Sequence, residues 1–138
     1  MSPENAKKPL GASGVTGQKG EDRAAGYLAS QGCAILDRNW HAHPGEVDII
    51  VQCPSQNEGE PTLAFVEVRT RHGRQGLAEE SISPRKAASM VSAAYAYMQA
   101  RSLDPETVPW RIDLLTIALE GKRSTINWIK SAISEDMI

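Results

Sequence analysis

The chain has 138 residues, with 15 basic and 17 acidic side chains and a formal net charge of -2 at pH 7. This length supports a single domain with a sizeable core and is too short for two domains. The slightly negative charge excludes a protein that coats nucleic acid without specificity, because such coating needs a strongly basic surface, so any contact with nucleic acid must be local.

Domain organisation follows from where the apolar pattern begins and ends. Residues 1–13 carry no periodic apolar pattern and are expected to form a disordered tail. One domain is expected over residues 14–130, followed by a C-terminal tail over residues 131–138. The N-terminus lacks a continuous apolar segment with the length of a signal peptide or a membrane span, so a cytoplasmic location is expected.

The first predicted helix runs from Thr16, a suitable N-cap residue, to Gly32, a residue type that ends helices. Glu21 lies on the same helical stripe as Ala24 and Leu28, which is expected to pack against a sheet. A solvated acid in the first turn is the simpler interpretation. An acid on a buried stripe instead needs a partner or a function.

Three strands are predicted next. Cys33–Trp40 and Glu46–Cys53 are expected to pair in antiparallel fashion through the turn-rich loop His41–Gly45. Leu63–Thr70 is apolar on both faces apart from Glu67, which is typical of a central strand. The segment Arg71–Gly76 is then expected to form a flexible basic loop.

The register of the first two strands decides which residues meet. A symmetric loop would place Cys33 opposite Cys53 and Arg38 opposite Asp48. The cysteines lack the close spacing of a zinc knuckle, and the register permits a disulfide between them. Two small buried thiols are the expected state in a reducing cytoplasm.

The second half of the chain predicts a helix and a hairpin. Ser83 before Pro84 marks a helix start, and apolar residues recur at helical spacing to about Arg101. The runs Trp110–Leu119 and Ser124–Ile129 are separated by a short polar segment and predict a closing hairpin. Within it, Asp113 beside Arg111 is expected to be structural.

Two of the predicted strands carry acids where buried strands rarely do. Asp48 and Glu67 lie in successive apolar strands, and a carboxylate costs several kcal/mol to desolvate unless something compensates it. Glu67 shares a face with Arg69, because alternate residues of a strand point the same way. The structural alternatives are ion pairs of Asp48 with Arg38, and of Glu67 with Arg69 or Arg38.

The order Asp48, a spacer, then Glu67-Val68-Arg69 resembles the signature of the PD-(D/E)XK nuclease superfamily, with Arg69 where that signature has Lys. The resemblance extends to the YraN-like family of small bacterial proteins in that superfamily. It covers the chain from about Gly17 to Trp128. The matching residues are Gly17, Gly20 and Glu21; Arg38 and Asn39; Gly45, Glu46 and Asp48; Phe65 to Val68; Lys86; and Arg111 with Asp113.

The resemblance implies an α/β fold with a mixed sheet flanked by helices, in the order α-β-β-β-α-β-β of a restriction-endonuclease-like core. It also implies a metal-dependent nuclease that acts on DNA, and a site that takes magnesium or manganese. In this interpretation Glu67 binds the metal directly, Asp48 bridges metal and substrate, and Glu21 acts through a bound water or a second ion.

The cationic residues of the expected site are less regular. Arg69 cannot act as a base at neutral pH, because the guanidinium pKa exceeds about 12, although it can neutralise phosphate charge. Lys86, near the start of the second helix, could supply the ammonium instead, and an ordinary surface lysine is an equally open interpretation. The basic residues that follow Glu67 could bind a backbone phosphate, or they could belong to a merely solvated loop. These residues are Arg69, Arg71, His72 and Arg74.

A second function stays open at this stage. The arginine at position 69 also suits a nucleic-acid-binding or protein-interaction module that keeps the nuclease fold without the chemistry. No phosphate-cradling glycine loop or nucleophile triad points to a small-molecule enzyme.

Overall fold

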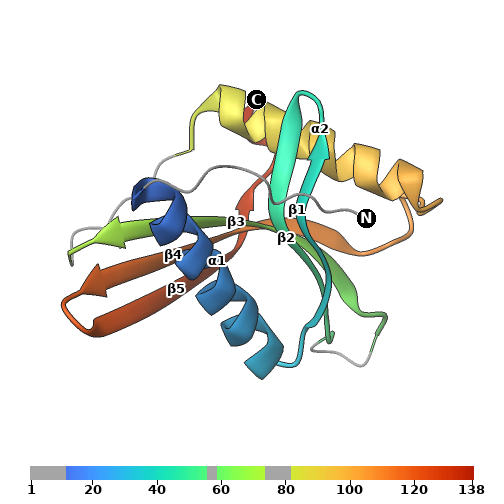
Figure 1. Ribbon diagram of the computed structural model, residues 1–138. Coiled ribbons are helices and arrows are strands. Elements are labelled where there is room, and N and C mark those ends of the chain that lie inside the picture. Colours follow the sequence, from blue (N-terminus) through green and yellow to red (C-terminus); the bar gives the residue numbers. More distant parts are fainter. Residues whose placement is uncertain (1–11, 56–58, 74–81) are drawn as a thin grey trace.

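The structure, a computed structural model, describes residues 12–55, 59–73 and 82–138. The described residues form two helices and five strands in the expected order, followed by a short 3-10 helix, and Figure 1 shows how the helices and strands are arranged. None of the described helices is long and apolar enough to cross a membrane. The elements are α1 (Ala12–Ser30), β1 (Ala34–Ala42), β2 (Gly45–Cys53), β3 (Thr62–His72), α2 (Pro84–Ala100), β4 (Trp110–Glu120), β5 (Arg123–Ile133) and η3 (Glu135–Met137).

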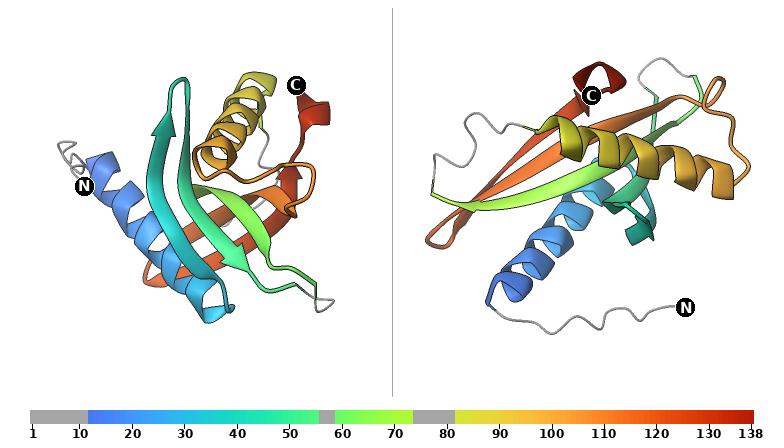
Figure 2. Two further views of the ribbon diagram at one scale, coloured as in Figure 1. Left: turned by 90° about the vertical axis from the view of Figure 1, so that its right-hand side faces the viewer. Right: turned by 90° about the horizontal axis from the view of Figure 1, so that it is seen from above.

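The strands form one mixed sheet in the order β1-β2-β3-β4-β5. Only the β3–β4 pair is parallel, and α2 makes the crossover that a parallel pair requires. Figure 2 shows the two helices on opposite faces of the sheet. The α/β fold is therefore confirmed, and it is consistent with a restriction-endonuclease-like core.

Each helix covers its own hydrophobic cluster. Alternate residues of β3 divide between the two clusters, as the period of a strand requires. The α2 cluster includes Phe65, Met90, Tyr97 and Ile112, and the α1 cluster includes Leu28, Ile49, Val66 and Leu115.

Strand β2 changes face at Asp48. Val47 packs in the α2 cluster and Ile49 in the α1 cluster, although residues two apart on a flat strand share a face. The pairing of β2 with β3 ends with Ile49 opposite Val66. The first half of β2 therefore parts from β3 and carries the β1–β2 hairpin toward α2.

The hairpin register differs from the expected one because its turn is shorter. Ala42 pairs with Gly45, which leaves two residues in the turn and places Arg38 opposite Ile49 rather than Asp48. An irregularity between Ile35 and Asp37 then shifts the register by one residue toward the chain ends.

That shift restores the expected alignment of the two cysteines. Cys33 and Cys53 are both buried, and the structure joins them by a disulfide with Cα atoms 4.2 Å apart. The expectation of two free thiols is therefore wrong.

Several element boundaries also differ from the sequence prediction. Strand β3 continues through Arg71 and His72, which were expected in a loop, and the remaining basic residue Arg74 lies outside the described residues. Strand β5 continues past Ile129 to Ile133, whose side chain is buried. Each extended strand gains pairing with β4, which the polar sequence at its end does not reveal.

The hairpin and α2 approach each other most closely at Gly45. A Cβ atom at this position would collide with the backbone carbonyl oxygen of Ser89, which cannot rotate away. Gly45 is buried, so only a residue without a side chain lets the end of the hairpin rest on α2.

We expect Gly45→Ala to lower the free energy of unfolding by about 1–3 kcal/mol, because the added methyl group must push the hairpin off α2. Gly26 provides the control, since it is exposed within α1 and a Cβ atom added there would meet nothing within 4 Å beyond the helix backbone itself. Gly26→Ala should raise stability by about 0.5–1 kcal/mol. Urea denaturation measures the free energy of unfolding of both variants, and equal stability of the two would contradict the close packing at Gly45.

Candidate active site

Asp48 and Glu67 lie on adjacent strands, directly beyond the last β2–β3 pair. The Oδ2 atom of Asp48 accepts a hydrogen bond from the backbone N–H of Val68 at 2.8 Å. The carboxylate thus takes the place of a strand carbonyl where β2 leaves β3. This bond fixes Asp48 against the strand that carries Glu67.

The environment of Asp48 disfavours its charged form. Its pKa is raised from 3.8 to about 7, first because burial desolvates the carboxylate and second because Glu67 is nearby. The Val68 N–H lowers the pKa without offsetting these effects, and Glu21 raises it further. Within the described residues Asp48 forms no ion pair, so a bound cation would stabilise its charge.

Glu67 has a different environment, because two cations bracket it. Its side chain is 11% exposed, and Lys86 Nζ lies 3.4 Å from Oε1 while Arg69 Nε lies 3.5 Å from Oε2. The shared face of Glu67 and Arg69 is as strand parity predicts. These contacts also match the structural alternative for Glu67, which was an ion pair.

Lys86 reaches the site from the first turn of α2. Ser83 is the N-cap, and its hydroxyl accepts a hydrogen bond from the Lys86 N–H at 3.1 Å. The cap fixes the start of the helix, and the helix start fixes the direction of the lysine. The sequence alone left a surface lysine and a site lysine equally open.

Glu21 approaches from the opposite face of the sheet. Gly20 is buried against Thr70 of β3, so α1 lies close to the strand just before Glu21. Its carboxylate is near enough to raise the pKa of Asp48. In the described parts of the chain, however, no three acidic, histidine or cysteine side chains lie close enough to hold one metal ion.

The donor set suits a hard divalent cation held by two carboxylates. Magnesium commonly takes one or two protein carboxylates and completes its octahedron with water and phosphate oxygens. Asp48 and Glu67 provide such a pair, and the partly desolvated charge of Asp48 is the feature that a cation would neutralise. Glu21 is then left with the indirect role that its family position implies.

The other predicted residues lie around this pair or away from it. Arg38 pairs with Asp22 at 2.8 Å, so it serves neither Asp48 nor Glu67. Arg71 and His72 are exposed at the end of β3, and Arg71 Nη1 donates to the carbonyl of Thr70 at 3.1 Å. They continue the line of the strand beyond Arg69.

Sequence reasoning missed the Val68 N–H, which fixes Asp48. A backbone donor has no residue type of its own, and nothing local shows that a strand pair ends at a given position. The only available signal was indirect, since an acid at the end of a paired strand can cap an unpaired N–H.

Comparison with known proteins finds extensive similarity. The sequence profile described as uncharacterised protein family UPF0102 matches residues 20–117. A UPF0102 protein of Roseiflexus castenholzii is 40% identical over 122 residues, which are 86% of this chain and 93% of the relative. One from Herminiimonas arsenicoxydans is 36% identical over 132 residues, covering 95% of this chain and 96% of the relative. The profile match includes Glu21, Asp48, Glu67, Arg69 and Lys86.

The raised pKa of Asp48 predicts a pH dependence of stability. The folded state binds the proton more readily than the unfolded state, so the free energy of unfolding should fall as pH rises from 3.8 to about 7 and then level off. Asp48→Asn keeps an acceptor for the Val68 N–H and removes the charge. It should be more stable than the parent at neutral pH by about 1–3 kcal/mol.

Urea denaturation across this pH range measures the difference, which should shrink as the solution becomes acidic. Asp136→Asn is the control, because Asp136 is exposed in η3. An Asp48→Asn variant that is weaker than the parent at neutral pH would show that the carboxylate is paired structurally.

Proposed function

Because the chain belongs to the uncharacterised protein family UPF0102, the YraN-like family that its motifs resemble, its function must be argued from its site, and we propose that it is a metal-dependent endonuclease acting on DNA. The proposed substrates include branched or damaged DNA, as resemblance to resolvase-type members of the superfamily implies. Family membership itself assigns no activity.

One observation carries the proposal. Asp48 and Glu67 lie together where two strands part, and two cationic groups, Lys86 and Arg69, lie against Glu67. Two oxygen ligands beside two fixed positive charges match what phosphodiester hydrolysis needs. An ordinary ion-pair network would leave no partly buried carboxylate without a cation, as Asp48 is in the described residues.

Asp48 and Glu67 are the proposed ligands of magnesium or manganese. A bound divalent ion supplies a Lewis acid that polarises the phosphodiester and lowers the pKa of water. Lys86 and Arg69 would stabilise the charge that develops on the phosphate oxygens. Arg71 and His72, which continue along β3, and Arg74 would contact the neighbouring backbone phosphates.

Lys86 is the proposed replacement for the superfamily lysine. Arg69 occupies the motif position, but its guanidinium stays protonated at neutral pH. Lys86 Nζ lies 3.4 Å from Glu67, about as close as Arg69 Nε at 3.5 Å. An ammonium is therefore available at the same carboxylate from a different element, and the arginine does not by itself remove the chemistry.

The second candidate is a nuclease-fold module that binds nucleic acid or protein without cleaving. The bracketing of Glu67 favours it, because two cations already satisfy that carboxylate. Calorimetry with magnesium and manganese separates the two candidates. Binding that is lost in Asp48→Ala supports the enzyme, and no binding supports the module.

Our direct prediction is that the protein cleaves DNA in the presence of manganese. Linear, flapped and four-way DNA should be compared, and Glu67→Gln should lower the rate by about 10²-fold or more, since it removes a ligand and the anchor of both cations. Glu106→Gln is the control, because Glu106 is exposed in the segment between α2 and β4. Absence of cleavage on all three substrates, or equal rates for the two variants, would contradict the endonuclease.

A further prediction distinguishes the specific role of Lys86 from the effect of positive charge on the nearby surface. Lys86→Gln should lower metal-dependent cleavage by about 10²-fold, and Lys86→Arg should recover only part of it, because a guanidinium has a different shape and cannot lose its proton. Arg85→Gln removes one charge from the neighbouring exposed position and should leave the rate unchanged. If Arg85→Gln and Lys86→Gln are equally impaired, overall charge and not the position of Lys86 matters.

A further inference from the structure

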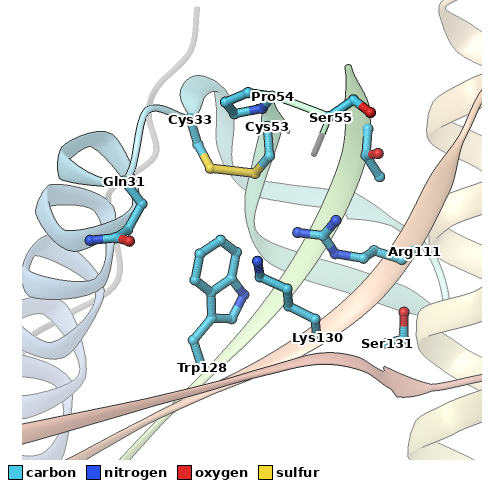
Figure 3. A pocket seen from close by; sticks show the side chains of 10 residues that line it. Gln31, Cys33, Cys53, Pro54, Ser55, Arg111, Trp128, Lys130 and Ser131 are labelled. Carbon is cyan, nitrogen blue, oxygen red and sulfur yellow. A yellow bond between two sulfur atoms is a disulfide. The ribbon is translucent and has the colours of Figure 1, made fainter. Parts of the chain in front are cut away.

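A second polar pocket lies at the other end of the sheet, on the side covered by α1. Its volume is about 540 Å³, and Figure 3 shows the Cys33–Cys53 disulfide along one wall with Arg111, Trp128 and Lys130 facing it. Thr62 lines this pocket at the start of β3, and Glu67 lies five residues further along the strand. The two sites are therefore separated by about 17 Å of extended strand.

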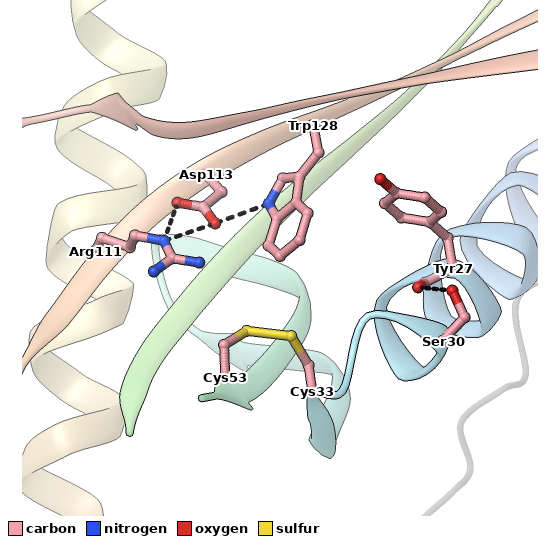
Figure 4. Close-up of a disulfide and its surroundings, with 7 residues drawn as sticks. All are labelled: Tyr27, Ser30, Cys33, Cys53, Arg111, Asp113 and Trp128. Carbon is pink, nitrogen blue, oxygen red and sulfur yellow. Dashed lines mark hydrogen bonds and ion pairs between the residues drawn. A yellow bond between two sulfur atoms is a disulfide. The ribbon is translucent and has the colours of Figure 1, made fainter. Parts of the chain in front are cut away.

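Asp113 forms the floor beneath this pocket and is completely buried. Its carboxylate accepts hydrogen bonds from Trp128 Nε1 at 2.9 Å and from Arg111 Nε at 3.0 Å (Figure 4). It also accepts one from the Ser131 N–H at 2.9 Å. The expectation that Asp113 is structural agrees with these contacts. They fix both the indole and the guanidinium at the pocket wall.

Arg111 is only partly used by this arrangement. Asp113 takes the Nε–H alone, and the Nη2 atom is buried with no hydrogen-bond partner among the described residues. An unsatisfied buried nitrogen on a charged group is costly, more so than one on a neutral group. In Figure 3 the guanidinium of Arg111 projects into the pocket.

Lys130 adds a second positive charge at the mouth. Its Nζ atom lies 4.5 Å from the centroid of the Trp128 ring, and the Arg111 guanidinium carbon lies 5.8 Å from the same centroid. No acidic residue of the described chain lines the pocket. With Asp113 beneath balancing one of the two cations, the pocket has an excess of positive charge.

We propose that this pocket binds a phosphate group, either as a free phosphomonoester or at the end of a nucleic acid. The Arg111 guanidinium, whose side chain is 18% exposed, provides a charge-assisted donor, Lys130 provides a second charge, and the hydroxyls of Ser55 and Thr62 line the same space. The volume lies within the range of pockets that hold small ligands. The site is separate from the pair Asp48 and Glu67, and binding here does not depend on nuclease activity.

Phosphate binding can be followed directly at Trp128, because its indole N–H donates to Asp113 at the pocket floor. In ¹H–¹⁵N NMR spectra of the full chain, inorganic phosphate at constant ionic strength should shift the Trp128 indole signal in a saturable way. Half-saturation is expected at about 1 mM, which is typical of a small anion held by two cations. The indole signals of Trp40 and Trp110, which do not line the pocket, should stay in place.

Two variants test the named donors. Lys130→Gln and Arg111→Lys should each weaken phosphate binding by about tenfold, since each removes one charge-assisted contact. Lys122→Gln is the matched control, because Lys122 is exposed in the β4–β5 turn, and it should bind as the parent does. Lys130 is itself exposed, so its variant keeps the test decisive if Arg111→Lys disturbs the Asp113 network.

A dinucleotide with and without a 5′-phosphate distinguishes the two sources of the ligand. Stronger binding of the phosphorylated form than of inorganic phosphate supports a nucleic-acid end, and equal binding supports a free phosphomonoester. An indole signal of Trp128 that does not respond to phosphate, or that responds equally in the parent and Lys130→Gln, would overturn the proposal.

Discussion

The separation of β2 from β3 at Asp48 is the constraint on which the site depends. A continuous ladder would pair Asp48 with its neighbour strand through the backbone and leave its side chain in an apolar layer. Instead β2 turns from one hydrophobic cluster to the other, and the Asp48 carboxylate accepts the N–H that the ladder leaves open. Two glycines of the family pattern serve this geometry. Gly45 lets the diverging hairpin rest on α2, and Gly20 lets α1 follow β3.

The two central carboxylates are unequal as a result. Glu67 lies between an ammonium and a guanidinium, whereas Asp48 is desolvated and close to other acids. Neighbouring acids with different environments are characteristic of sites that divide tasks between two groups. A structural salt-bridge cluster would be expected to balance both acids, so the imbalance supports the proposed role of Asp48 as a cation ligand.

Local patterns predicted most of the elements but not the contacts between them. The Ser83 cap, the helical period of α2 and the alternation of β3 are encoded by near neighbours, and they located α2, β3 and the shared face of Glu67 and Arg69. The predicted hairpin register was wrong because the actual register depends on a two-residue turn together with an irregularity between Ile35 and Asp37. The position of Lys86 was open for a similar reason, since it depends on how the crossover helix packs on the sheet, which no short stretch of sequence specifies. The disulfide was misjudged because chain geometry permitted it while the assumed compartment argued against it.

The first three turns of α2 link parts of the molecule that are far apart in sequence. Lys86 contacts Glu67, and Ser89 and Ala93, about one and two turns later, border the space beside Gly45 at the tip of the hairpin. A small slide of this helix along its axis would therefore change the distance between ammonium and carboxylate and the seating of the hairpin together. Changes in distant core residues under α2 could alter the site without replacing any of its side chains, which makes helix position itself a variable on which selection can act.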